Sequence, residues 1–243
     1  MSKTSTPKIL FKHLINPKTL QKGTYIDDLE QALARYFETP VFPVNSGRSA
    51  IYLALKVLGI GQGDEVLLQA YTCNAVPNPI LWSGATPVYV DIEEETLNID
   101  PKDLVKKISP KSKAIIVQHT FGNPAKIREI LKIADQYKLK VIEDCAHALG
   151  AKIDSKLLGT FGDLAILSFG REKVISSLTG GALIVNDKSL LEKVETELKL
   201  VNVCMDFINK KEEEEKEKKE VGETNSLQNM KLEELQKLIF SSE

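Results

Sequence analysis

Hydrophobic residues along this chain follow two spacings, one typical of amphipathic helices and one typical of buried strands. The first clear helical pattern has apolar side chains at Ile26, Leu29, Leu33 and Phe37. Further segments of this kind predict helices over Tyr25–Phe37, Arg48–Leu58, Cys73–Ser83, Asp100–Lys107 and Pro124–Tyr137. Between them lie short apolar runs, at Val41–Val44, Glu65–Gln69, Val88–Asp91, Ala114–Gln118, Lys140–Glu143, Ala165–Ser168 and Ala182–Val185.

This alternation predicts an α/β fold with three layers, in which helices cover both faces of a mostly parallel central sheet. We expect the domain to span residues 25–200, after an N-terminal extension of residues 1–24. Residues 201–243 differ in character, because every position from Lys210 to Glu220 is charged. Such a block is typical of a solvated helix or a linker. The apolar residues beyond it share one helical face and predict an amphipathic tail: Leu232, Leu235, Leu238 and Ile239.

Composition narrows the function classes. The chain has 243 residues, of which 42% are hydrophobic and 27% charged, as in globular proteins. A net charge of -2 argues against nucleic-acid binding. Three widely spaced cysteines form neither a zinc motif nor an even set for disulfides, so we expect no metal site. No apolar segment is long enough for a membrane span, and no signal peptide is evident, so we expect a cytoplasmic protein without a membrane partner.

Polar residues follow several of the expected strands, where ligands bind in open α/β sheets. The first group, Asn45-Ser46-Gly47-Arg48, opens a helix. Backbone N–H groups at a helix N-terminus can bind an anion. A simple N-cap is the more common role of serine and glycine at this place.

The second group is Glu143-Asp144, with His147 three residues after the aspartate. One interpretation is a carboxylate that faces a buried cation, supported by the imidazole. The other is helix capping by Asp144 and a hydrogen-bonded core histidine. The sequence does not decide between them.

Two further residues complete the candidate set. Lys173 follows an apolar strand, where partial burial would favour its neutral, nucleophilic amine. A single loop lysine is more often solvated surface. Tyr71 follows another strand and could cover a planar ligand, although core packing is the more common role of one tyrosine.

Together these groups are the parts that a pyridoxal 5′-phosphate (PLP) site needs. A lysine binds the cofactor as a Schiff base, an aspartate keeps the pyridine nitrogen protonated, and a helix N-terminus holds the phosphate.

The chain closely resembles the DegT/DnrJ/EryC1/StrS family of sugar aminotransferases, PLP enzymes with the aspartate aminotransferase fold. The resemblance runs from Tyr25 to Val194. The motifs that carry it are Asn45-Ser46-Gly47-Arg48-Ser49-Ala50, Gly61-Gln62-Gly63-Asp64-Glu65-Val66, Gly84-Ala85-Thr86-Pro87-Val88, Ile142-Glu143-Asp144, Gly159-Thr160-Phe161-Gly162-Asp163 and Ser168-Phe169 with Lys173.

The resemblance assigns a role to each candidate. It implies that Lys173 forms the Schiff base, that Asp144 pairs with the pyridinium nitrogen and that His147 lies beside the cofactor ring. It implies that the phosphate binds at Ser168 and at the cradle of Ser46, Gly47 and Arg48. Cys73 falls where many members place an aromatic ring that stacks on the cofactor, so either Tyr71 stacks there instead or a smaller group covers the ring.

The resemblance implies transfer of an amino group from an amino acid to a nucleotide-linked keto-sugar, for polysaccharide or glycoconjugate synthesis, by a homodimer. It fades near Leu200, and the residues beyond do not resemble the small C-terminal domain that closes over the substrate in this family. We therefore expect a cofactor-binding domain without that second domain. An alternative is a catalytically impaired remnant that binds PLP at most.

Overall fold

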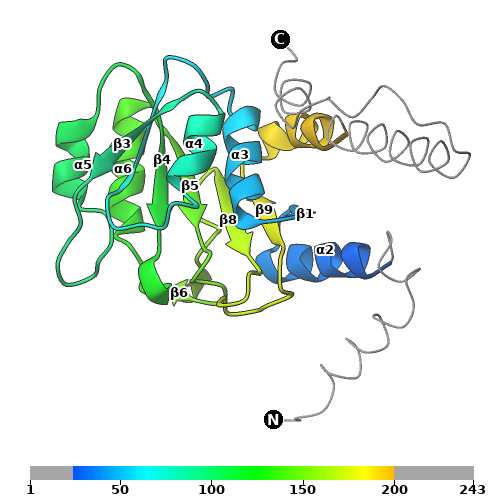
Figure 1. Cartoon of the computed structure of the whole chain (residues 1–243). Coiled ribbons are helices and arrows are strands. Elements are labelled where there is room, and N and C mark those ends of the chain that lie inside the picture. The colour runs from blue at the N-terminus through cyan, green and yellow to red at the C-terminus, as the bar shows by residue number, and fades with distance from the viewer. Residues whose placement is uncertain (1–23, 200–243) are drawn as a thin grey trace, which may run out of the picture. The chain divides into compact units, whose positions relative to one another are not determined.

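The computed structural model describes residues 24–199. Their centre is a seven-stranded sheet in the order β1-β9-β8-β5-β4-β2-β3 (Figure 1). The strands are β1 (Val41–Val44), β2 (Glu65–Gln69), β3 (Thr86–Val90), β4 (Ser112–Gln118), β5 (Lys140–Asp144), β8 (Leu164–Ser168) and β9 (Gly181–Val185). Neighbouring strands from β3 to β8 pair in parallel, whereas β9 runs antiparallel to both β8 and β1. Six strands therefore point the same way, and the predicted mostly parallel sheet is confirmed.

Within residues 24–188, five α-helices accompany the sheet. They are α2 (Thr24–Phe37), α3 (Gly47–Val57), α4 (Pro77–Trp82), α5 (Pro101–Lys107) and α6 (Ile127–Tyr137). The shorter elements are the 3-10 turns η2 (Thr120–Gly122) and η3 (Lys188–Leu190) and the hairpin of β6 (Lys152–Ile153) and β7 (Lys156–Leu157). Residues 191–199 are also helical. The chain divides into two units between Lys188 and Ser189, and the account below concerns residues 24–188.

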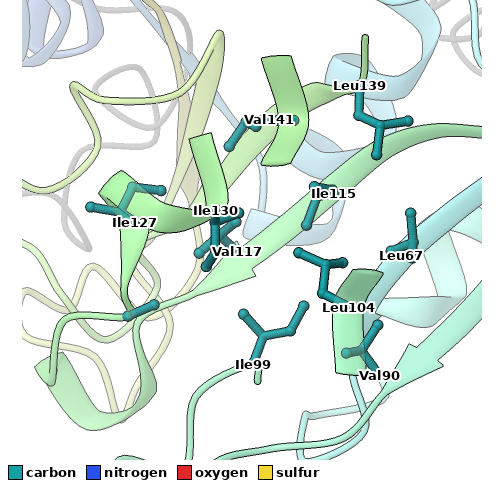
Figure 2. Close-up of a cluster of buried hydrophobic side chains, with 12 residues drawn as sticks. Leu67, Val90, Ile99, Leu104, Ile115, Val117, Ile127, Ile130, Leu139 and Val141 are labelled. Carbon is teal, nitrogen blue, oxygen red and sulfur yellow. The ribbon is translucent and has the colours of Figure 1, made fainter. Parts of the chain in front are cut away.

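Two hydrophobic clusters show that helices α2, α5 and α6 cover one face of the sheet. Figure 2 shows the first, in which Leu104 of α5 and Ile130 of α6 meet Ile115 and Val117 of β4. The second joins α2, through Phe37, to the neighbouring end of the same sheet. These side chains are at most 7% exposed, so burial of apolar surface holds this layer in place.

Helices α3 and α4 cover the opposite face. Contacts of α3 with β1, β8 and β9, and of α4 with α3 and β3, place these two helices. Successive residues of a strand face opposite sides of a sheet, so Glu143 faces the first layer and Asp144 faces α3. The predicted three-layer fold is confirmed.

Most predicted elements occur within a few residues of their expected bounds. The largest error is the helix expected over Cys73–Ser83, because α4 begins only at Pro77. Pro77 and Pro79 are tolerated in the first turn of a helix, but they have no backbone N–H group to donate to the carbonyl oxygens of Cys73 and Ala75, so the helix does not extend towards Cys73. Among residues 24–199, no helix combines the length and the apolar composition that crossing a lipid bilayer requires.

Candidate active site

The carboxyl ends of the parallel strands bring the predicted residues to one edge of the sheet. There, Ser46 follows β1 and caps α3, because its extended backbone lets its Oγ accept a hydrogen bond from the backbone N–H of Ser49 at 3.2 Å. The N-cap, the more common of the two roles considered, is therefore present. The cap also places the first-turn N–H groups of α3 at the edge where an anion could bind. Arg48 is exposed in this turn.

Two glycines let the start of α3 approach its neighbouring strands closely. A Cβ atom on Gly47 would lie 3.1 Å from Cβ of Ser168, the last residue of β8. A Cβ atom on Gly181 would lie 2.7 Å from the backbone nitrogen of Gly47, closer than real Cβ atoms come. Small residues are therefore required here, and they bring together Gly47 and Ser168, two of the expected phosphate ligands.

Asp144 ends β5 and is only 4% exposed. Its Oδ1 accepts a hydrogen bond from the backbone N–H of Ala146 at 2.9 Å. Burial raises the pKa of this carboxyl, and the effect outweighs the opposing influence of the Ala146 N–H group and of the positive charge of Lys173. The residues after Asp144 form a turn, so the helix-capping interpretation is wrong. A buried carboxylate of this kind favours a cationic partner.

Glu143, the other half of the acidic pair, has a structural role on the opposite face. Its fully buried carboxylate accepts hydrogen bonds from the backbone N–H groups of Gly159, Phe161 and Gly162 at 2.6–2.9 Å. His119 donates a fourth hydrogen bond to this carboxylate, from Nε2 at 3.1 Å. The proton must lie on Nε2 because Nδ1 accepts a hydrogen bond from the Ala125 N–H group. Glu143 thereby joins the loop between β7 and β8 to the end of β4.

His119, Glu143 and Cys145 also form a cluster of potential metal ligands, with their ligand atoms within 4.8 Å of one another. Both ring nitrogens of His119 already take part in hydrogen bonds. Burial raises the pKa of the Cys145 thiol well above its ordinary value, which disfavours the thiolate that a metal needs. We therefore interpret this cluster as structural.

Lys173 and His147 meet directly. Lys173 Nζ lies 2.8 Å from His147 Nε2. Burial, followed by the charge of Lys173, lowers the pKa of His147, so Nε2 of the neutral imidazole accepts a hydrogen bond from Lys173 Nζ. Both residues are half-buried and line a pocket of about 610 Å³.

The same pocket contains residues that the sequence did not single out, and Phe121 is the most informative. Its ring stacks on His147 with 5.8 Å between ring centroids and 13° between ring planes. The remaining lining residues are Gly170, Arg171, Glu172 and Val174. Because these four residues are close to Lys173 in the sequence, they could have been predicted to line the site. No sequence pattern predicts that Phe121 stacks on His147.

Tyr71 and Cys73 lie outside the residues that line the pocket. Tyr71 is 48% exposed, so the preference for core packing is wrong. Its ring contacts Phe121 edge to face, with centroids 6.5 Å apart. Cys73 is also exposed. Phe121 thus stands between Tyr71 and His147, and the stacking roles expected for Tyr71 and Cys73 stay predictions.

Comparison with known proteins identifies the family. A model of the DegT/DnrJ/EryC1/StrS aminotransferase family matches residues 5–242. The chain belongs to this family. The match extends beyond Tyr25 and Val194, the limits within which the resemblance was recognised, in both directions.

Relatives of this aminotransferase-family chain include proteins with names that refer to sugars or polysaccharides. The chain is 40% identical to GDP-perosamine synthase of Escherichia coli O157:H7 over 173 residues, which cover 71% of this chain and 48% of the relative. It is 37% identical to the spore coat polysaccharide biosynthesis protein SpsC of Bacillus subtilis over 176 residues, 72% of this chain and 45% of the relative. The structure of NtdA from Bacillus subtilis with bound cofactor PMP is similar, with a TM-score of 0.72, 32% identity and coverage of 80% of this chain and 45% of that chain. The chain thus spans about half the length of the proteins it matches.

Proposed function

We propose that this chain carries the cofactor site of a PLP-dependent aminotransferase that transfers an amino group from an amino acid to a nucleotide-linked keto-sugar. The observation that carries the proposal is the contact between Lys173 and His147 in a pocket at the sheet edge where Asp144 is buried. Membership of the family and the sugar-related names of the relatives support it.

The residues present fit PLP. Gly47 leaves the start of α3 without a side chain beside Ser168, which suits a phosphate group bound by backbone N–H groups and a hydroxyl. Asp144 is a buried carboxylate that a protonated ring nitrogen would pair. Lys173 presents its amine in the pocket, within reach of an aldehyde bound there.

Each residue would have a separate task. When bound, PLP supplies a conjugated ring that takes up the electron pair released at the substrate carbon. Lys173 Nζ would hold the cofactor and would move the proton at the substrate carbon. The Asp144 carboxylate would hold the proton on the ring nitrogen. His147 Nε2 accepts a hydrogen bond from Lys173 Nζ and would thereby orient it. The first turn of α3 and Ser168 hold the phosphate.

The acceptor and the assembly are part of the proposal. GDP-perosamine synthase and a spore coat polysaccharide biosynthesis protein are among the relatives, which favours a nucleotide-linked keto-sugar as acceptor and polysaccharide synthesis as the context. We also propose that the working protein is a homodimer, as the family resemblance implies.

The test is the visible absorption spectrum of the purified chain with PLP, before and after borohydride reduction, followed by peptide mapping. We expect a band that borohydride bleaches and a reduced label on Lys173. Lys173→Ala should lose the label, whereas Lys113→Ala, which changes an exposed lysine of β4, should keep it. A covalent label retained by Lys173→Ala would refute the assignment of the lysine.

Adding an amino acid then tests transfer. Conversion of the bound cofactor to the pyridoxamine form supports the aminotransferase. A chain that is labelled on Lys173 but converts no cofactor with any of the common amino donors would support the alternative, a remnant that binds PLP without turnover.

A further inference from the structure

We propose that the turn of residues 119–123, between β4 and α6, clamps His147, and that Phe121 is thereby a positioning residue for the amine of Lys173. The inference rests on the proposed function in one respect, namely that Lys173 is the reacting group. It adds Phe121, an apolar residue that acts on Lys173 through the imidazole of His147.

The turn meets His147 at two places. The Phe121 ring lies nearly parallel to the imidazole, at 13° and 5.8 Å between centroids. Next to it, Gly122 packs so closely that a Cβ atom there would lie 3.2 Å from the backbone oxygen of His147. Gly122 also has a φ of 82°, which side-chain-bearing residues rarely adopt. The turn therefore restricts both the ring plane and the backbone of His147.

Hydrogen bonds to buried groups hold the turn of residues 119–123 in place. The His119 side chain is fixed between Glu143 and the Ala125 N–H group, and its backbone N–H donates to the Asp144 carbonyl oxygen at 3.2 Å. The fully buried Asn98 adds two bonds, since its Oδ1 accepts from Thr120 N at 2.8 Å and its Nδ2 donates to the Asn123 carbonyl oxygen at 3.0 Å. These contacts leave the turn little freedom.

Phe121 is the residue in this turn that packing alone does not explain. Its side chain is 69% exposed, so it contributes little to the core. Its backbone is left-handed, with φ 54° and ψ 25°, a conformation that is unfavourable for phenylalanine. Such outliers persist where the surrounding structure imposes them, and they cluster at functional sites. Stacking on His147 gives this exposed ring a role.

The consequence for Lys173 follows from the geometry of the imidazole. A hydrogen bond to Nε2 is directional, and the acceptor lone pair lies in the ring plane. Fixing that plane fixes the direction from which Lys173 Nζ can approach, and the two nitrogens lie 2.8 Å apart. Without the stacked ring, the imidazole could rotate, and the amine would spend less time in the position for covalent capture.

The experiment compares Phe121→Asn with Phe121→Tyr. Asparagine tolerates left-handed backbone but removes the ring, whereas tyrosine keeps the ring, and the exposed position lets both variants fold. The first readout is the ¹⁵N spectrum of the histidine imidazoles in the cofactor-free full chain. It reports the hydrogen bond at His147 Nε2, and the signal can be assigned with His147→Gln because the chain has three histidines. The second is the rate at which PLP is captured at Lys173.

We expect Phe121→Asn to shift the His147 Nε2 signal towards that of an unbonded imidazole and to slow capture by about 3- to 10-fold, the effect of losing one aromatic pair. Phe121→Tyr should keep both the Nε2 signal and the rate of capture at their wild-type values. This would show that loss of the ring, and not any substitution at this position, causes the effect of Phe121→Asn. An Nε2 signal in Phe121→Asn equal to that of the wild type would overturn the clamp. If the wild-type chain captures no PLP at Lys173, the proposed function fails, and the ¹⁵N spectrum decides the clamp by itself.

Discussion

Replacing Glu143 with glutamine changes one atom of a fully buried side chain and should nevertheless be severely destabilising. Each carboxylate oxygen accepts two hydrogen bonds, Oε1 from Phe161 and Gly162 and Oε2 from Gly159 and His119. Glutamine has one oxygen and an NH₂ group, which only donates. Whichever way the amide is turned, two buried donors lose their acceptor.

The structure allows the magnitude to be worked out. A buried donor without a partner costs about 1–3 kcal/mol, so two of them cost about 2–6 kcal/mol. His119 cannot relieve the loss by moving its proton, because Nδ1 would then face the Ala125 N–H group. For a chain of this size, a loss of about 4 kcal/mol lowers Tm by about 8–16 °C.

Glu65→Gln is the matched control, with the same change in charge and shape. The hydroxyl groups of Ser109 and Ser112 both bond to Oε2 of Glu65. A single amide oxygen can keep both bonds, so we expect a loss below about 1 kcal/mol. Urea unfolding followed by circular dichroism gives the free energy of unfolding of both variants and of the wild type.

The reasoning fails if Glu143→Gln loses no more stability than Glu65→Gln. That result would mean that the four donors around Glu143 find other acceptors, and that the bonds between the end of β4 and the loop between β7 and β8 are not the constraint described above.

Two further predictions concern the edge of the sheet. Burial raises the pKa of Asp144 in the folded chain above its ordinary value of 3.8. At a pH between the unfolded-state and the folded-state pKa, Asp144 therefore binds more protons in the folded chain than in the unfolded chain. Its contribution to stability consequently falls as pH rises through this interval. Asp144→Asn should therefore raise the Tm of the cofactor-free chain at pH 7 and lose this advantage below pH 3.8, and an unchanged Tm at pH 7 would contradict the burial argument. Gly181→Ala should lower the free energy of unfolding by about 3 kcal/mol, since its Cβ atom would lie 2.6 Å from the backbone carbon of Ser46. Gly170→Ala, whose Cβ atom would meet nothing closer than 3.8 Å, should cost under about 0.5 kcal/mol in the same urea assay.

Local patterns were sufficient for most of the fold. The apolar runs are buried on both faces of a parallel sheet, so they lack polar alternation, and the helices between them have one apolar face. The predicted helix over Cys73–Ser83 began too early, because Pro77 and Pro79 can start a helix but have no N–H groups to form the hydrogen bonds that would extend it towards Cys73. The hairpin of β6 and β7 was missed because two-residue strands carry no periodic signal.

The candidate residues were also readable, because each follows a strand and the parallel strands end at one edge. Asp144, Lys173 and the start of α3 needed only their order along the chain and the family motifs to be selected. What the chain order could not give was the face on which each side chain lies. Glu143 and Asp144 are adjacent and similar in chemistry, yet one is a fully bonded structural carboxylate and the other is buried on the opposite face of the sheet.

The sequence by itself therefore determined the layers, the family and the residue types at the strand ends, since these depend on local periodicity and on motif spacing. Only the tertiary structure decided that Phe121 stacks on His147 and that His147 meets Lys173. These contacts join residues from separate loops, and one of them requires a left-handed backbone at Phe121. Such a conformation is imposed by buried hydrogen bonds from distant residues, so no local pattern of the chain can indicate it.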